Sequence, residues 1–193
     1  METMNAAEKP PQTGDPAPDV ELLDTEGRAV SLSTAWGKRP AVVVFLRHLA
    51  CTFCRQQLAW LRRDFAEFQA AGVDVVCIAQ GSPKVGKAYF ILYDLPFPLL
   101  LCGDDLDAYR RWGLLRGTGW DLFKPLVLLR AITAFLQGHI QTKIEGDAGQ
   151  LGGGFVVDCG GVVRYVYRSR DMADTVVDAK LLDAARRVGQ APS

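Results

Sequence analysis

The chain has 193 residues, of which 49% are apolar and 23% charged, the proportions of a globular domain with a core of ordinary size. Lysine plus arginine equals aspartate plus glutamate at 22 each, so no basic field favours nucleic acid or anionic lipid. The chain has no apolar run of membrane-spanning length and no secretory signal at its start, which predicts a cytoplasmic protein.

Three features are expected in the first part of the chain. Prolines oppose regular structure over 1–18, which predicts a flexible tail ahead of a single domain over 19–193. Two short segments at 20–23 and 29–32 flank a turn and predict a β-hairpin. The continuous, β-branched run 41–46 is typical of a strand buried on both faces.

A strand–helix–strand unit is predicted next. Apolar side chains recur at helical spacing from Cys51 to Ala71, and Gly72 is a natural helix end. The apolar run 73–79 then predicts a second buried strand. Because a helix connects the strands at 41–46 and 73–79, we expect them to lie parallel in one sheet.

The remaining elements are predicted to be shorter. A helix is expected over about 83–92, a strand over about 97–102 and another helix over about 104–112. An inserted helical region is expected at about 114–149, before the last hairpin. Its apolar part, 125–137, is consistent either with burial within one chain or with a homodimer.

The end of the chain completes an α/β pattern. Strands at 155–158 and 162–167 flank a Gly160–Gly161 turn and predict a hairpin, and a last helix is expected over 174–188. The order of elements is that of a thioredoxin-like sandwich, with a central mixed sheet flanked by helices and an added N-terminal hairpin.

Cys51 and Cys54 form a C-x-x-C where the first buried strand feeds the long helix, as in thioredoxin-like redox proteins. A thiolate at a helix N-terminus is stabilised by exposed N–H groups and the positive end of the helix dipole. We therefore interpret Cys51 as the nucleophile and Cys54 as the resolving thiol. The alternatives are two ordinary cysteines or half of a zinc site, with His48 as a third ligand.

Three neighbours of the dithiol are further candidate catalytic residues. His48 would act as a base, donate to a peroxide oxygen or tune the thiolate, or it would be a hydrogen-bonded loop residue. Arg47 and Arg55 would add positive charge near an anion, although a surface position is the ordinary expectation for an arginine. Thr52 is expected to cap the helix.

Several segments carry a family resemblance. They are 14–19 with the hairpin that follows, the strand into Cys51, the phrases 45–48 and 51–57, and the glycine-rich stretch 151–163. They resemble the alkyl hydroperoxide reductase/thiol-specific antioxidant family, and within it the peroxiredoxin-like 2 (selenoprotein U-like) branch, over roughly 14–188. The chain departs from peroxiredoxins at Val44, His48 and 152–154, where they carry Pro, Thr and Arg.

The resemblance implies a thiol-dependent oxidoreductase that needs no metal, flavin or nucleotide. Its substrate would be a peroxide, endoperoxide or disulfide, reduced through a Cys51–Cys54 dithiol/disulfide cycle. The electrons would come from a thioredoxin-like protein or a low-molecular-weight thiol. The alternative is a non-catalytic thioredoxin-fold module that binds a metal or a partner protein, with 125–137 as its interface.

Overall fold

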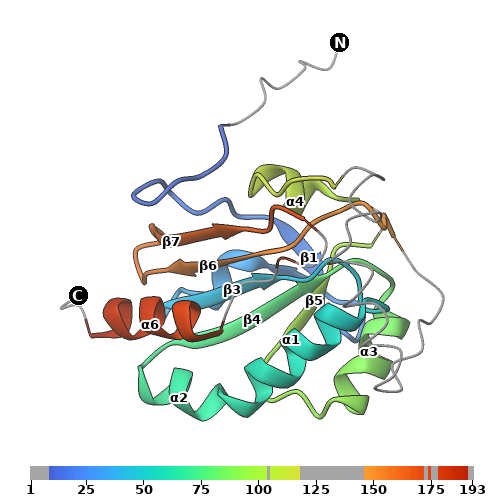
Figure 1. Ribbon diagram of the computed structural model, residues 1–193, viewed down its shortest axis with the longest axis horizontal. Helices are drawn as coiled ribbons and strands as arrows, with labels where there is room; N and C mark the ends of the chain where they lie inside the picture. Colours follow the sequence, from blue (N-terminus) through green and yellow to red (C-terminus); the bar gives the residue numbers. More distant parts are fainter. Residues whose placement is uncertain (1–8, 104, 118–145, 172–173, 175–177, 191–193) are drawn as a thin grey trace.

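The computed structural model describes residues 9–103, 105–117, 146–171, 174 and 178–190. Within these residues seven strands form one mixed sheet, in the spatial order β2-β1-β5-β4-β3-β6-β7 (Figure 1). In chain order the strands are β1 (Glu21–Leu23), β2 (Ala29–Ser31), β3 (Ala41–Phe45), β4 (Asp74–Ala79), β5 (Leu99–Leu101), β6 (Gly153–Val157) and β7 (Val163–Arg168).

The centre of the sheet is parallel, as predicted for β3 and β4. Val42 pairs with Val75 and Phe45 with Ile78, and β5 lies parallel to β4 on its other side. The carboxyl ends of β3 and β4 therefore meet at one edge of the sheet. The loop that leads to the C-x-x-C leaves β3 at this edge, so residues that follow β4 lie beside it.

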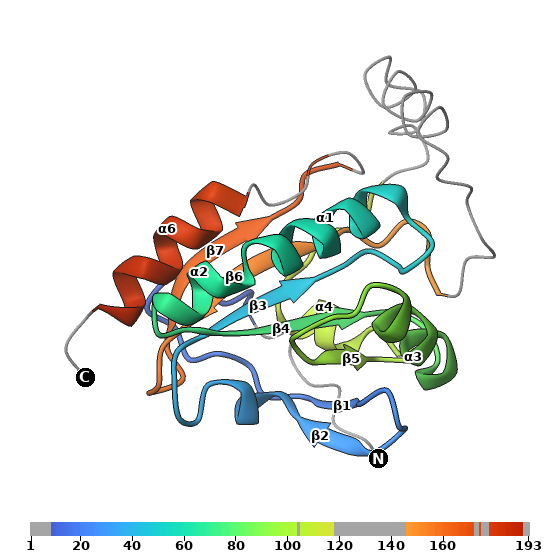
Figure 2. The same cartoon turned by 90° about the horizontal axis from the view of Figure 1, so that it is seen from below.

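Helices cover both faces of the sheet. One face carries α1 (Thr52–Arg63), α2 (Phe65–Ala70), α3 (Pro83–Leu92) and α6 (Asp178–Gly189), and the other carries the short helices η1 (Leu32–Ala35) and α4 (Asp107–Arg111) (Figures 1 and 2). The single helix predicted from Cys51 to Ala71 is interrupted at Asp64, whose backbone leaves the helical conformation with φ −94° and ψ 6°.

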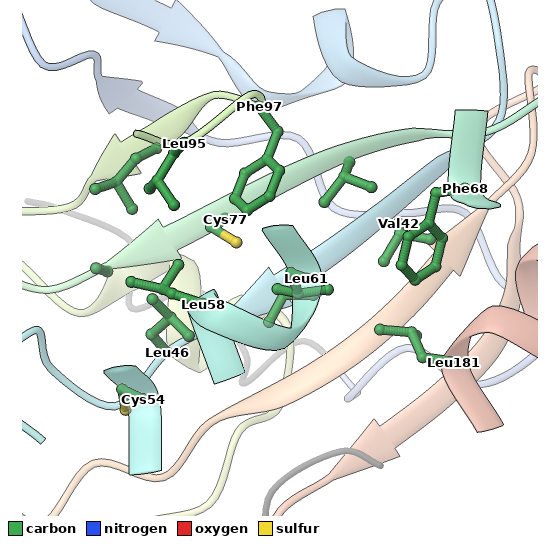
Figure 3. Close-up of a cluster of buried hydrophobic side chains, with 14 of the residues drawn as sticks. Val42, Leu46, Cys54, Leu58, Leu61, Phe68, Cys77, Leu95, Phe97 and Leu181 are labelled. Carbon is green, nitrogen blue, oxygen red and sulfur yellow. The ribbon is translucent and has the colours of Figure 1, made fainter. Parts of the chain in front are cut away.

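The sheet has an apolar core on each face, because successive side chains of a strand point to opposite sides. Val42 and Leu46 face α1, whose Leu58 and Leu61 pack over Cys77 in the cluster shown in Figure 3. The alternate positions of β3 face the other way, into an aromatic cluster of Phe45, Tyr109, Trp112 and Phe155. Every residue of β3 is buried, which holds the start of the C-x-x-C loop firmly.

The hairpins at both ends of the chain are confirmed by antiparallel pairing of β1 with β2 and of β6 with β7. The prediction of a flexible tail is wrong for residues 9–18, the part of the tail that the structure describes. The backbone N–H of Gly14 donates to Val163 O (2.8 Å) and that of Ala17 to Gly161 O (2.8 Å). This proline-rich stretch lacks regular structure but is pinned to the last hairpin, and residues 1–8 lie outside the described part.

Only the two ends of the predicted insertion are described, and they pair with each other. The N–H of Gly117 donates to Gly149 O (2.7 Å) and the N–H of Leu151 to Leu115 O (3.0 Å). The apolar segment 125–137 falls outside the described residues. In the part of the chain that is described, no helix is long and apolar enough to cross a bilayer.

Candidate active site

The two thiols lie at the start of α1. Cys51 is the N-cap residue, with extended backbone (φ −74°, ψ 126°), and its carbonyl accepts the N–H of Arg55 (3.0 Å). Cys54 lies in the first helical turn. Thr52 is the first residue of the helix, so the prediction that it caps α1 is wrong. Both thiols are free, and the exposed fractions of Cys51 and Cys54 are only 6% and 2%.

The pKa values of the two cysteines are shifted in opposite directions. The pKa of Cys51 is lowered from 9.0 to about 6, because the Cys54 thiol donates a hydrogen bond to its sulfur and Arg47 adds positive charge. Backbone N–H groups of the first helical turn lower it further and outweigh the opposing effect of burial. The pKa of Cys54 is raised by burial and by the neighbouring Cys51 sulfur. Cys51 is therefore the thiolate near neutral pH, and Cys54 keeps its proton.

Arg47 is buried, with 8% of its surface exposed, so the ordinary expectation of a surface arginine is wrong. Its guanidinium donates from Nη1 to Cys51 Sγ (3.5 Å), from Nη2 to Ala148 O (2.7 Å) and from Nε to Gln150 O (3.2 Å). Its backbone N–H donates to Cys54 Sγ (3.3 Å). One residue thus contacts both sulfur atoms, once through its side chain and once through its backbone.

His48 is also buried, at 2% exposure, and its imidazole is neutral. Its pKa is lowered from 6.5 to about 4, first by burial and then by the positive charges of Arg47 and Arg55. Among the described residues, its Nδ1 atom has no hydrogen-bond partner. A buried polar atom without a partner is costly, so His48 has a free hydrogen-bonding position close to the dithiol.

Arg55 lies in the first turn of α1 and contacts the same loop. It donates from Nε to Leu49 O (3.4 Å) and from Nη2 to the hydroxyl of Tyr89 (2.8 Å), and its guanidinium lies 5.4 Å from the centre of the Tyr89 ring. The positive charge of Arg55 lowers the pKa of His48. The structure thus places Arg47 against the sulfur atoms, and Arg55 against the loop that carries His48.

Sequence reasoning missed three buried polar groups that hold this loop. Tyr109 donates its hydroxyl to Leu46 O (2.6 Å), Gln80 donates its side-chain amide to Arg47 O, and the backbone carbonyl of Gln150 accepts from Arg47. One signal was available for Gln80, because it follows a parallel strand at the edge where the C-x-x-C lies. Tyr109 and Gln150 come from distant segments that no local pattern connects to the dithiol.

The glycine run before β6 allows a close approach of backbones. A side chain at Gly152 would overlap with Phe45 O, and one at Gly153 would lie 2.6 Å from Tyr167 O. At Gly152 the approaching backbone is the end of β3, where the chain enters the C-x-x-C loop, and at Gly153 it is β7. These glycines let β6 lie close to both of its neighbours, β3 and β7, next to the site.

The other cysteines lie away from this arrangement. Cys77 is buried in β4, and burial alone raises its pKa, as expected of a core residue. Cys102 is half-buried, and Cys159 is exposed in the last hairpin. Among the described residues, no group of three or more His, Cys, Asp or Glu side chains is placed to hold a metal ion.

Comparison with known proteins gives a consistent result. Residues 13–166 match the AhpC/TSA family. The chain is 26% identical over 182 residues to "Thioredoxin-like protein AAED1, chloroplastic" of Arabidopsis thaliana, covering 89% of this chain and 72% of that protein. It is 25% identical over 181 residues to "Peroxiredoxin-like 2C" of Homo sapiens, covering 85% of this chain and 78% of that protein.

The fold is shared with solved structures as well. The crystal structure of Peroxidoxin BcpB from Mycobacterium tuberculosis superposes with a TM-score of 0.66 at 20% identity, over 92% of this chain and 98% of that chain. This likeness agrees with the thioredoxin-like sheet and helices described above.

Proposed function

Because the chain belongs to the AhpC/TSA family and is a peroxiredoxin-like oxidoreductase, we propose that it reduces hydroperoxides through a Cys51–Cys54 dithiol/disulfide cycle. One observation carries the proposal. The Cys51 sulfur lies at the start of α1, beside the Arg47 guanidinium and the Cys54 thiol. A thiolate is the form of cysteine that attacks a peroxide, and this arrangement stabilises it near neutral pH.

In the first step the Cys51 thiolate attacks the terminal oxygen of the hydroperoxide. The S–O bond forms as the O–O bond breaks, and the sulfur loses two electrons to the leaving alkoxide, which takes a proton and departs as the alcohol. Arg47 holds the thiolate in place before the attack. His48 is neutral, and its unpartnered Nδ1 supplies a hydrogen bond to a peroxide oxygen.

In the second step Cys54 resolves the sulfenic acid on Cys51. The S–S bond forms as the S–O bond breaks, and the hydroxyl leaves as water with the proton that Cys54 has kept. A thioredoxin-like protein or a low-molecular-weight thiol then supplies two electrons and two protons to reopen the disulfide. Neither step requires a metal or an organic cofactor.

The burial of Cys51 favours a small substrate. Only 6% of the Cys51 residue is exposed, so a small hydroperoxide group fits the approach to this residue better than a disulfide on the surface of a folded protein. An endoperoxide is a finer version of the same proposal, because its O–O bond breaks by the same attack. The alternative of a metal-binding or partner-docking module stays a prediction, because its interface, 125–137, lies outside the described residues. A cytoplasmic location and a homodimer remain predictions.

Intact-mass spectrometry after graded doses of a hydroperoxide tests the proposal. The reduced protein should consume one equivalent and form a disulfide that maps to Cys51 and Cys54. Cys51→Ser should lose this consumption, and Cys54→Ser should stop at a sulfenic acid that a dimedone-type reagent traps. Cys159→Ser, which changes an exposed cysteine outside the site, is the matched control and should behave as the wild type. Full consumption by Cys51→Ser would refute the proposal.

The pH dependence of the first step follows from the acidity of Cys51. With its pKa lowered to about 6, the thiolate fraction rises as the pH rises through 6 and levels off above 7. The second-order rate of peroxide consumption, measured by stopped flow, should follow that curve. A rate that keeps rising until pH 9 would show an ordinary thiol at this position.

A further inference from the structure

Gln80 is a buried polar side chain that the proposed steps do not use. It follows β4 directly and is 1% exposed. Its Nε2 donates to Arg47 O and to Asp147 O (3.2 Å), and its Oε1 accepts the backbone N–H of Asp147 (2.6 Å). Both ends of the amide are therefore engaged, one with the C-x-x-C loop and both with the chain at Asp147.

The same stretch of chain, residues 146–150, also holds the side chain of Arg47. The carbonyls of Ala148 and Gln150 accept hydrogen bonds from its guanidinium, which in turn donates to Cys51 Sγ. Gln80 thus contacts Arg47 twice, directly at its carbonyl and indirectly through the 146–150 segment. Gly146 fits this contact, because it has a φ of +92° and a side chain there would overlap with Gln80 Oε1.

We propose that Gln80 is a positioning residue, which ties the 146–150 segment to the C-x-x-C loop and so holds the Arg47 guanidinium against the Cys51 sulfur. The inference rests on the proposed role of Cys51 as the nucleophile. Gln80 touches neither sulfur atom in the contacts described, and it acts on their reactivity through Arg47.

The 146–150 segment is also held by contacts that do not involve Gln80, so the loss of Gln80 should affect only its link to the C-x-x-C loop. Gly149 O accepts the N–H of Gly117 (2.7 Å), and Asp147 forms an ion pair with Arg116 (2.5 Å). These contacts fasten the segment to residues 115–117 and not to the loop that carries Arg47. Without Gln80 the segment should therefore remain folded, while the distance between the Arg47 charge and the sulfur becomes variable.

The Arg47 charge acts within a defined set of neighbours. The titratable and charged groups around the dithiol are Arg47 and His48 from the loop, Cys54 and Arg55 from α1, Tyr109 from α4, and the Asp147–Arg116 pair beside the segment. Two of these side chains lower the pKa of Cys51. Cys54 does so through a hydrogen bond, and Arg47 through its positive charge. Releasing it should make the Cys51 thiol less acidic.

The test uses Gln80→Met, which keeps the volume of the side chain and removes its hydrogen bonds. The readout is the alkylation rate of Cys51 with iodoacetamide as a function of pH, followed on the Cys51 peptide by mass spectrometry. The midpoint should move up by about one pH unit, so that alkylation at pH 5 becomes about tenfold slower. Gln69→Met is the matched control, because Gln69 accepts a hydrogen bond from another arginine, Arg39, and lies on α2 away from the dithiol. The Cys51 alkylation midpoint of this variant should stay unchanged.

A double-variant cycle with Arg47→Met isolates the route of the effect. If Gln80 acts through Arg47, then Gln80→Met should cause no further shift once Arg47 has been replaced. An unchanged midpoint in Gln80→Met, or an equal shift in the Arg47→Met background, would overturn the proposal. If thermal unfolding shows that Gln80→Met is not folded, Gly146→Ala takes its place. This variant displaces the segment from Gln80 and should give the same upward shift of the Cys51 midpoint.

The result separates this inference from the proposed function. Alkylation involves no peroxide, so a shift in Gln80→Met would support the positioning role even if no hydroperoxide were consumed. A wild-type midpoint near 6 that Gln80→Met does not move would remove the positioning role alone. An alkaline midpoint in the wild type would remove the premise of both.

Discussion

Arg47 and His48 show how burial changes what a side chain does. In sequence they are a basic pair in a loop, for which solvent exposure is the usual expectation of the arginine and a hydrogen-bonded loop position is one expectation of the histidine. In the structure Arg47 is held by backbone carbonyls against the Cys51 sulfur, and its charge helps to keep His48 neutral. One residue lowers the pKa of a thiol and that of an imidazole, because both lie within reach of the same guanidinium.

The neutral state of His48 predicts acid-sensitive stability. Above pH 6.5 the imidazole is neutral in both the folded and unfolded chain. Between pH 6.5 and 4 the unfolded chain binds a proton that the folded protein does not, because the folded pKa is lowered to about 4. The free energy of unfolding should therefore fall as the pH falls from 7.5 to 4.5, with a contribution from His48 of about 2–3 kcal/mol.

Urea unfolding of the wild type and of His48→Asn at these two pH values measures that contribution. The variant lacks the titrating group, so its free energy of unfolding should fall less than that of the wild type. Parallel curves for the two proteins would mean that His48 is protonated in the folded state.

The arrangement of strands determines which residues meet at the site. Because β3 and β4 are parallel and in register, the C-x-x-C loop and Gln80 leave the sheet at the same edge. On the other side of β3, the glycines that lead into β6 allow that strand to pair closely up to Phe45. The site is thus assembled from the ends of neighbouring strands, as is common in open α/β sheets.

The close approach at Gly152 predicts a cost for any side chain there. Gly152→Ala would place a Cβ against the backbone carbonyl oxygen of Phe45. Because that oxygen belongs to a paired strand, it cannot move away without a cost in free energy. We expect the free energy of unfolding to fall by about 1–3 kcal/mol, measured by urea denaturation. Gly37→Ala, where the new Cβ would make an ordinary 3.8 Å contact, should change it by less than about 0.5 kcal/mol.

At the scale of the whole molecule, the sheet separates two cores that support the site from opposite sides. The cluster under α1 includes both site cysteines, and the aromatic cluster on the other face holds Tyr109, whose hydroxyl binds the Leu46 carbonyl just ahead of the loop.

Phe155→Ala tests the contribution of the aromatic core. Phe155 is fully buried, with its ring centre 4.7 Å from that of Trp112 and 5.9 Å from that of Phe45. Truncation should lower the free energy of unfolding by about 3–5 kcal/mol by urea denaturation. The Cys51 alkylation midpoint of the folded variant should not move. Leu92→Ala, at a residue that is 74% exposed, should cost less than about 0.5 kcal/mol; equal losses would contradict a core role for Phe155.

The amino-acid sequence by itself determined most of the described elements, because helix and strand periodicity is local and can be read from neighbouring residues, although it did not show the break of the long helix at Asp64. It also placed Cys51 and Cys54 at the start of a helix behind a buried strand, and predicted that β3 and β4 lie parallel. Those features depend on short-range spacing and on the connection between consecutive elements, which the order of residues contains directly.

Only the tertiary structure decided which groups surround the two sulfur atoms. Arg47 lies against Cys51 because the carbonyls of Ala148 and Gln150, about a hundred residues further along the chain, accept its hydrogen bonds. Gln80 and Tyr109 reach the same loop from other segments of the chain. Such contacts depend on strand order, register and side-chain packing across the sheet, and spacing along the chain contains none of them. Most of the described elements and the dithiol were therefore predictable, and the surroundings that set its acidity were not.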